Sequence, residues 1–174
     1  MWIFGYGSLM WDGWEGCFAF TQRVVAELRG YKRTVNKGSV KNWGTQGCPC
    51  PTLNLESDAD ASCVGIAFEF PEARRTEVEA YLAKREGKNF VLAPFQILVE
   101  RARPVQASVP LYTGNNILPS RTTQELVSMV QLAHGANGRC SDYVTGVYEQ
   151  LTKLGISDPI VTCLWELLRT NPTG

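Results

Sequence analysis

Two stretches of the sequence combine residue types and spacing that could serve a reaction. The first, "GYGSLMW" at residues 5–11, places two glycines around Tyr6 directly after the apolar residues "MWIF". Because glycine lets other groups approach the main chain closely, this pattern predicts a tight turn with accessible backbone amides, suited to holding a ligand. Taken alone, the same glycines also fit an ordinary turn at a strand end, with Tyr6 and Trp11 as core aromatics.

The second stretch is the C-terminal end of a predicted helix, where Glu86 is the last residue. Val78, Leu82 and Glu86 recur at intervals of four, so they share one helix face, which the apolar members predict to be buried. Burial and the carbonyl dipoles at a helix end both disfavour a charged carboxylate, which would tune Glu86 for general-base work. The alternative is a structural ion pair between Glu86 and Arg85 or Lys88.

Few other side chains are candidates for catalysis or metal binding. His134 is the only histidine, and its place in "AHGANG", beside a predicted helix end, is typical of a capping or surface residue. Cysteines occur at positions 17, 48, 50, 63, 140 and 163 and are predicted to be free thiols. The close pair Cys48 and Cys50 lacks partners for a zinc site, so no metal site is expected. Carboxylates therefore remain as the candidate catalytic groups.

Charge and hydropathy narrow the class of partner. The 174 residues include 17 basic and 17 acidic residues, which gives a formal net charge of zero and no field that would attract nucleic acid. The chain shows neither a secretion signal nor an apolar run of membrane-spanning length, so we expect no membrane partner and a cytoplasmic location. That reducing compartment is the reason to expect thiols rather than disulfides.

The elements that must position these residues follow from hydrophobic periodicity. Strands are predicted, with a turn at Gly30 and a polar break at 57–61, at residues 1–4, 23–28, 32–38, 51–56, 62–70, 95–100 and 107–114. A helix opened by Pro71 and closed by Gly87 is predicted at 71–86. Three more helices, the first with a capping box from Thr122 to Glu125, are predicted at 122–135, 141–155 and 158–170.

No repeat or low-complexity linker divides these elements. They predict one α+β domain over residues 1–174, a small curled or barrel-like mixed β-sheet with packed helices. The C-terminal part, about 119–170, is expected to be helical.

Four stretches of this chain resemble the ChaC-like γ-glutamylcyclotransferases. "WIFGYGSLMW", "YLAKREGKNF", "VPLYTGN" and "AHGANGRCSDYV" occur in the order and at about the spacing of that family, over residues 2–144. The first two stretches together are far more specific than a lone glycine pair. The resemblance implies a barrel-like α+β fold and an enzyme, without metal or cofactor, that converts glutathione or a related γ-glutamyl compound to 5-oxoproline and a released amine.

The resemblance also implies roles for single residues. The γ-glutamyl group would be received by the loop residues Gly5, Tyr6, Gly7, Ser8 and Leu9. Glu86 would be the catalytic acid/base, with a supporting place for Glu77 and a substrate contact for Tyr143. In such a reaction the substrate's α-amino nitrogen attacks its own γ-carbonyl, so the protein supplies orientation, amide donors and a proton acceptor but no nucleophile.

One segment departs from the family pattern. Where glutathione-degrading members have "FWQGS" and then "DHRG", residues 34–56 read "TVNKGSVKNWGTQGCPCPTLNLE" and plainly keep only Gly38 and Ser39. Lys37, Lys41 and Trp43 either contact the leaving half of the substrate or belong to a solvated loop. The substrate is therefore open between glutathione and a γ-glutamylamine or γ-glutamyl amino acid. A non-enzymatic γ-glutamyl binding module on the same fold is the alternative of another class.

Overall fold

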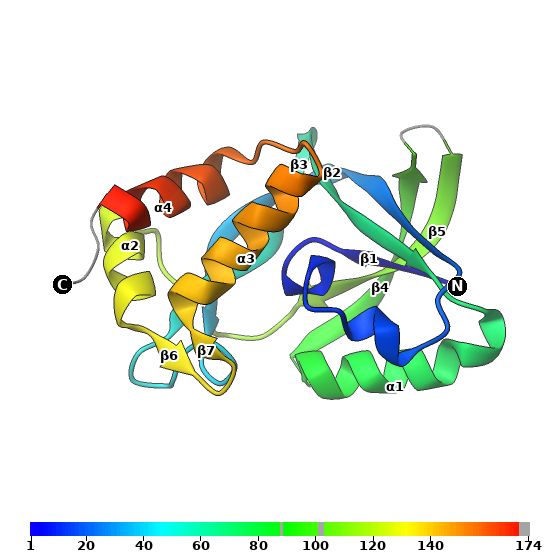
Figure 1. Cartoon of the computed structure of the whole chain (residues 1–174), viewed down its shortest axis with the longest axis horizontal. Helices are drawn as coiled ribbons and strands as arrows, with labels where there is room; N and C mark the ends of the chain where they lie inside the picture. The colour runs from blue at the N-terminus through cyan, green and yellow to red at the C-terminus, as the bar shows by residue number, and fades with distance from the viewer. Residues whose placement is uncertain (88, 101–102, 171–174) are drawn as a thin grey trace. The chain divides into compact units, whose positions relative to one another are not determined.

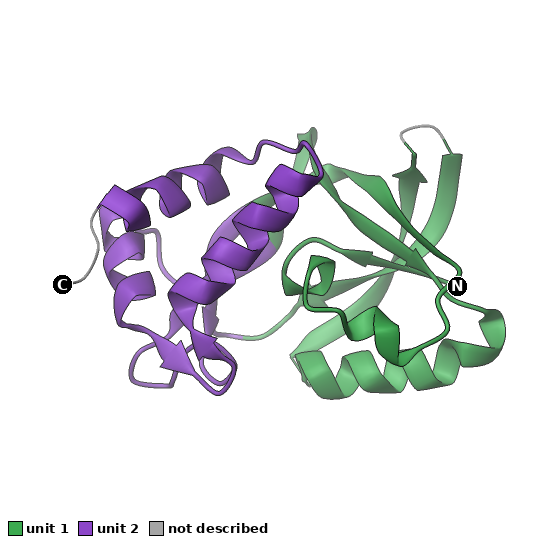
Figure 2. Cartoon of the chain, in the orientation of Figure 1, with its two compact units in different colours: residues 1–33, 55–114 green, residues 34–54, 115–174 purple. Residues whose placement is uncertain are grey.

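The computed structural model describes residues 1–87, 89–100 and 103–170 (Figure 1). They divide into two compact units, each described by itself below (Figure 2). The barrel unit comprises Met1–Arg33 and Leu55–Gly114, and the helical unit comprises Thr34–Asn54 and Asn115–Gly174. The expectation of a single domain over the whole chain stays a prediction.

The sheet of the barrel unit closes on itself. Its strands lie in the order β1 (Trp2–Gly5), β3 (Cys50–Glu69), β2 (Gln22–Ser39), β4 (Phe90–Val99) and β5 (Arg103–Tyr112). β1 runs antiparallel to β3 and parallel to β5, so the barrel is mixed. The predicted fold class, a barrel-like mixed sheet with packed helices, is confirmed.

The residues of β1 are apolar on both faces of the strand. Trp2, Ile3 and Phe4 are all buried, as expected for a strand with neighbours on either side and no solvent face. The register runs from Trp2 opposite Glu69 to Gly5 opposite Ile66. This pairing fixes where β1 ends, and therefore where the "GYGSLMW" stretch begins.

Two predicted interruptions are wrong. Gly30, with φ of 77°, lies inside the continuous strand β2 rather than at a turn between strands. Likewise, the polar residues 57–61 lie inside the continuous strand β3. Polar side chains on neighbouring strands partner each other there, as where Lys32 Nζ donates to Asp58 Oδ2 at 3.0 Å. A strand segment with such partners needs no apolar face.

The central predicted helix is confirmed, with its first turn in 3₁₀ form. A 3₁₀ turn, η3 (Glu72–Arg74), leads into α1 (Arg75–Glu86), which lies beside β4 (Figure 1). Val78 and Leu82 are fully buried, as the four-residue spacing predicts. Gly87 ends the helix with φ of 81°, a conformation that favours glycine, and its N–H donates to Ala83 O at 2.9 Å.

The predicted helices of the last third are confirmed as α2 (Thr123–Leu132), α3 (Cys140–Lys153) and α4 (Pro159–Thr170). The capping box is present: Glu125 N donates to Thr122 Oγ1 at 3.3 Å and Thr122 N donates to Glu125 Oε2 at 2.8 Å. α3 packs on both α2 and α4 through buried apolar side chains. No helix in the described ranges is long and apolar enough to cross a membrane.

α2 ends earlier than predicted, so His134 is not at a helix end. It begins the short strand β6 (His134–Gly135), which pairs with β7 (Gly138–Arg139). Gly135 is needed here for close approach: a Cβ at this position would lie 2.5 Å from Gly44 N. The glycines of "AHGANG" thus serve a tight hairpin packed against the segment that precedes β3.

Candidate active site

The loop after β1 forms a short 3₁₀ helix, η1 (Ser8–Met10), with Gly7 as its N-cap. Carbonyl groups of the loop already have donors: Tyr6 O accepts from Arg33 Nε at 2.8 Å, and Gly7 O accepts from Met10 N at 2.9 Å. Because the C=O and N–H of a trans peptide unit point in opposite directions, the N–H groups of Gly7 and Ser8 face away from those donors. This geometry suits the predicted use of loop amides as hydrogen-bond donors.

Most loop side chains shape the loop rather than extend from it. Tyr6 is buried and its hydroxyl donates to Pro110 O at 3.0 Å, while the side chain of Leu9, within η1, is also buried. A Cβ on Gly5 would lie 2.9 Å from Leu9 Cβ, so glycine is required there by close packing. Ser8 is half-buried, so its side chain is less enclosed than those of Tyr6 and Leu9, and its contact with a ligand stays a prediction.

Glu86 ends α1 at the edge of a pocket in the barrel unit. The pocket measures about 330 Å³ and is lined by Glu79, Leu82, Ala83, Glu86, Phe90 and Leu92. This volume is within the range of small-molecule sites, about 300–1,000 Å³. The Glu86 side chain is 18% exposed, so its carboxylate is partly withdrawn from water yet accessible from the pocket.

One guanidinium joins the loop to Glu86. Arg85 Nη2 donates to Ser8 Oγ at 3.1 Å, and Arg85 Nε donates to Glu86 Oε1 at 3.2 Å. The same guanidinium also pairs with the Asp12 carboxylate. The structure therefore brings together Ser8 and Glu86, which are 78 positions apart in the sequence. The alternative ion pair of Glu86 with Arg85 is present too, and Lys88 lies outside the described residues.

Arg85 is held as a cation. Burial lowers the pKa of its guanidinium, but the hydrogen bond and charge of Asp12, with the charge of Glu86, more than offset this and raise that pKa above its usual value. A positive charge therefore lies permanently between the loop and Glu86.

Glu77 lies elsewhere on α1. Nine residues before Glu86, it is on the opposite side of a helix of 3.6 residues per turn. Its side chain is 53% exposed and its carboxylate pairs with Arg74 Nη1 at 2.6 Å. Glu79, not Glu77, shares the pocket with Glu86. The supporting role implied for Glu77 stays a prediction.

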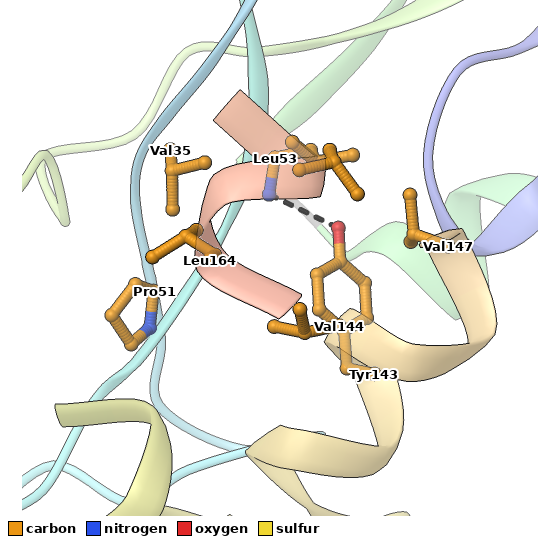
Figure 3. A pocket seen from close by; sticks show the side chains of 8 residues that line it. Val35, Pro51, Leu53, Tyr143, Val144, Val147 and Leu164 are labelled. Atoms are coloured by element: carbon orange, nitrogen blue, oxygen red, sulfur yellow. Dashed lines mark hydrogen bonds between the residues drawn. The ribbon is translucent and has the colours of Figure 1, made fainter. Parts of the chain in front are cut away.

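Tyr143 lies in the helical unit, where its hydroxyl has a structural partner. Figure 3 shows this side chain extending from α3 among apolar residues, with its Oη accepting the N–H of Leu53 at 3.0 Å. Its ring packs against Trp43, with 5.6 Å between the ring centroids. Trp43, a candidate contact from the divergent segment, thus lies against Tyr143. Their contact with substrate stays a prediction.

The prediction of free thiols is wrong for two cysteines. Cys50 and Cys140 form a disulfide with 5.6 Å between their Cα atoms, whereas Cys17, Cys48, Cys63 and Cys163 form no disulfide in the described structure. The bridge joins the start of β3 to the start of α3, within the helical unit. The two cysteines are 90 residues apart in the sequence, so local spacing could not predict this pairing.

Metal-binding side chains do not gather in the part of the chain that the structure describes. No group there has three or more histidine, cysteine, aspartate or glutamate residues arranged to hold a metal ion. His134 is exposed on β6, opposite Arg139 of β7.

Comparison with known proteins identifies the family. The family model described as "ChaC-like protein" matches residues 1–171. This chain belongs to the ChaC-like family. Among its curated relatives, the "Glutathione-specific gamma-glutamylcyclotransferase 1" of Danio rerio is 30% identical over 155 residues, which cover 86% of this chain and 78% of the relative. "Gamma-glutamylcyclotransferase 2-3" of Arabidopsis thaliana is 28% identical over 179 residues, which cover 97% of this ChaC-like chain and 88% of the relative.

A solved structure supports the fold. The crystal structure of a γ-glutamyl cyclotransferase specific to glutathione from yeast aligns with a TM-score of 0.85 and 18% sequence identity. The alignment covers 98% of the ChaC-like chain and 96% of the yeast chain. At this identity the match establishes the shared fold.

Sequence reasoning missed residues that hold the loop of this ChaC-like site. The sequence pattern could have identified Arg33 as a buried residue, because the two-residue alternation of β2 puts it on the same strand face as buried Val35. No local pattern identifies Asp12, because its guanidinium partner is 73 positions away. The sequence predicts Arg85 only as an ion-pair partner of Glu86, since spacing cannot indicate its bond to Ser8.

Proposed function

We propose that this chain is a γ-glutamylcyclotransferase that acts on glutathione and releases 5-oxoproline and cysteinylglycine. Membership of the ChaC-like family supports the reaction class, and the name of the zebrafish relative supports the substrate. The observation that carries the proposal is the Arg85 guanidinium, which donates to both Ser8 of the glycine loop and the Glu86 carboxylate, and Glu86 in turn lines a pocket.

The reaction is an intramolecular ring closure. The neutral α-amino nitrogen of the γ-glutamyl group attacks the γ-carbonyl carbon, a bond forms between them, and the bond from that carbon to the cysteine nitrogen breaks. The protein's main task is to fold the substrate so that the reacting atoms meet, which can contribute several kcal/mol. The N–H groups of Gly7 and Ser8 would donate to the substrate carboxylate or to the developing oxyanion.

Glu86 would carry the proton. As the amino nitrogen attacks, its surplus proton passes to the Glu86 carboxylate, and the same proton then passes to the departing cysteine nitrogen. One carboxylate suffices because the two nitrogens are bonded to the same carbon in the tetrahedral intermediate. The partly buried position of Glu86 beside a pocket fits this requirement.

The test is Glu86→Gln, which keeps side-chain size but cannot accept a proton. We expect turnover of glutathione to fall by about 10²–10⁴, the usual contribution of general acid–base catalysis. Stability should change by less than about 1 kcal/mol, because the pair is partly exposed and Arg85 retains Asp12 as a partner. Turnover is followed as 5-oxoproline release, and unfolding by thermal denaturation.

Glu149→Gln, at an exposed position of α3 in the helical unit, is the matched control and should match the parent. Glu77→Gln tests the supporting role of Glu77 in the same assay. Near-parental turnover in folded Glu86→Gln would remove Glu86 as the base. Binding of γ-glutamyl compounds by the parent without any 5-oxoproline would instead favour a binding module.

Segment 34–56 is the reason to test more than one substrate, because it departs from the pattern of glutathione-degrading members. The parent protein is incubated with glutathione, a γ-glutamylamine and a γ-glutamyl amino acid. We expect kcat/KM to be highest for glutathione. A higher value for either other compound would keep the reaction and change the leaving group.

A further inference from the structure

Arg85 contacts both chemical parts of the candidate site, and neither family membership nor the proposed reaction assigns it a role. Arg85 is the penultimate residue of α1, and its side chain is 19% exposed. We propose that Arg85 is a positioning residue that aims the Ser8 hydroxyl at the substrate and holds Glu86 in line for proton transfer. This inference rests on the proposed cyclotransferase reaction.

The two contacts use different nitrogens of the guanidinium. Nε donates to Glu86 Oε1 at 3.2 Å, while Nη2 donates to Ser8 Oγ at 3.1 Å. A planar guanidinium fixes both donor directions at once, which a lysine ammonium cannot do. Adjacent residues on a helix do not normally face each other, so the bond between Arg85 and Glu86 depends on how the Arg85 side chain is turned.

Asp12 holds the Arg85 side chain in that orientation. Its carboxylate pairs with Arg85 Nη2, the same nitrogen that donates to Ser8 Oγ. The Asp12 side chain is 25% exposed and comes from the segment that follows η1. Anchoring by Asp12 orders a long side chain before substrate binds, so less conformational entropy is lost when the reacting groups are aligned.

The bond to Ser8 has a direct chemical consequence. Because Ser8 Oγ accepts a hydrogen bond from Arg85, one lone pair of that oxygen is engaged and its own O–H is left to donate elsewhere. The adjacent positive charge makes this hydroxyl a stronger donor, since charge-assisted hydrogen bonds are the strong ones. A substrate carboxylate or the developing oxyanion is the acceptor that such a hydroxyl suits.

The bond to Glu86 fixes where its carboxylate lies. Arg85 Nε donates to Oε1, which leaves Oε2 to accept the proton of the attacking amine and to pass it to the leaving nitrogen. Asp12 meanwhile continues to balance the charge of Arg85.

A merely structural alternative is that Arg85 ties the end of α1 to the segment around Asp12. The two roles differ in what a conservative change does. Lysine at position 85 keeps the charge and one ion pair but cannot serve Ser8 and Glu86 together. Glutamine removes the charge. Loss of a purely structural tie would lower Tm with either change, without a selective fall in kcat over KM.

The experiment compares Arg85→Lys, Arg85→Gln, Ser8→Ala and the double variant Arg85→Gln/Ser8→Ala with the parent. We expect kcat to fall by about tenfold for Arg85→Lys and by about 10²-fold for Arg85→Gln, with smaller changes in KM. Asp12, which anchors Arg85, is kept in every variant.

The double variant measures whether Arg85 works through Ser8. We expect its loss of kcat/KM to be clearly smaller than the product of the two single losses, because the residues act as a unit. Arg121→Gln is the matched control, since Arg121 pairs with Glu125 on the exposed face of α2, and it should keep the parental profile. Thermal denaturation of each variant verifies folding.

The outcomes separate this proposal from the proposed function. A parent that releases 5-oxoproline, together with Arg85→Gln that stays within twofold of parental kcat and kcat/KM, overturns the role of Arg85 alone. Fully multiplicative losses in the double variant overturn the link to Ser8. A folded parent that releases no 5-oxoproline from any γ-glutamyl compound overturns both the proposed function and this inference.

Discussion

Side chains of the candidate site divide into those that hold backbone and those that the proposed function assigns to substrate. Tyr6 and Leu9 are buried and fix the loop, whereas Ser8 and Glu86 share a guanidinium beside a pocket. The family motif therefore contains residues of two kinds, and only burial and hydrogen bonding tell them apart. Tyr143, whose hydroxyl accepts a backbone N–H, belongs by its visible contacts to the first kind.

Tyr143→Phe tests this division at the residue scale. Removing the hydroxyl leaves the buried N–H of Leu53 without that acceptor, so the free energy of unfolding should fall by about 1–3 kcal/mol. Denaturant unfolding measures the change. Tyr148→Phe, on the same helix and stacked on Trp165, is the control and should cost less. KM for glutathione is measured alongside: a rise supports the predicted substrate contact, and a parental KM limits Tyr143 to a structural role.

At the scale of elements, the decisive feature is the junction between β1 and η1. β1 ends where its pairing with β3 ends, and η1 folds back so closely that Leu9 lies against Gly5. Trp14 Nε1 donates to Leu9 O at 3.0 Å, which ties η1 to η2 (Trp14–Cys17). The loop amides are therefore held by the packing of short elements, not by a long helix.

Gly5→Ala should disturb this junction. The added Cβ would lie 2.9 Å from Leu9 Cβ and 3.3 Å from the Leu9 carbonyl carbon, which is backbone and cannot rotate away. Overpacking of this kind costs about 1–3 kcal/mol, or a fall in Tm of about 2–10 °C for a chain of this size. Release of 5-oxoproline should fall as well, because the displaced loop includes Gly7 and Ser8.

Gly16→Ala is the control for that variant. Gly16 lies in η2, where an added Cβ meets nothing within 4 Å. Its Tm and turnover should match the parent. Equal Tm and turnover in Gly5→Ala and Gly16→Ala would show that close packing at β1 is not what requires glycine.

At the scale of the whole molecule, one covalent link outweighs any single contact. The Cys50–Cys140 disulfide closes a loop of 90 residues that includes Leu55–Gly114 of the barrel unit. In the chain-entropy model, closing a loop of this length stabilises the folded state by about 4–5 kcal/mol, chiefly by restricting the unfolded chain. The link also fixes the start of α3 to the start of β3.

Reduction of the disulfide should therefore lower Tm. Before reduction, titration of the denatured protein should detect the four cysteines that lie outside the disulfide, and after reduction all six. Cys140→Ser should lower Tm to about that of the reduced parent, whereas Cys48→Ser, which alters a free thiol, should not. Six thiols in the unreduced protein would contradict the bridge.

Much of the fold was predictable because its signals are local. The periodicity of Val78 and Leu82 and the glycine that follows Glu86 predicted α1, and the Thr122–Glu125 capping box predicted α2. In both cases the interacting groups are within four residues of each other. The continuity of β2 through Gly30 was not predictable in this way, since it depends on the neighbouring strand rather than on the residues themselves.

The sequence by itself determined most element types and the mixed barrel-like α+β class, and it predicted two parts of the candidate site, the "GYGSL" loop and Glu86. These follow from periodicity, capping and motif resemblance, which are properties of short stretches. Only the tertiary structure decided that Arg85 joins Ser8 to Glu86, that Glu79 rather than Glu77 shares the pocket, and that Cys50 meets Cys140. Contacts between distant residues depend on how elements pack, and no local pattern encodes which charged or sulfur-bearing side chain will find its partner there.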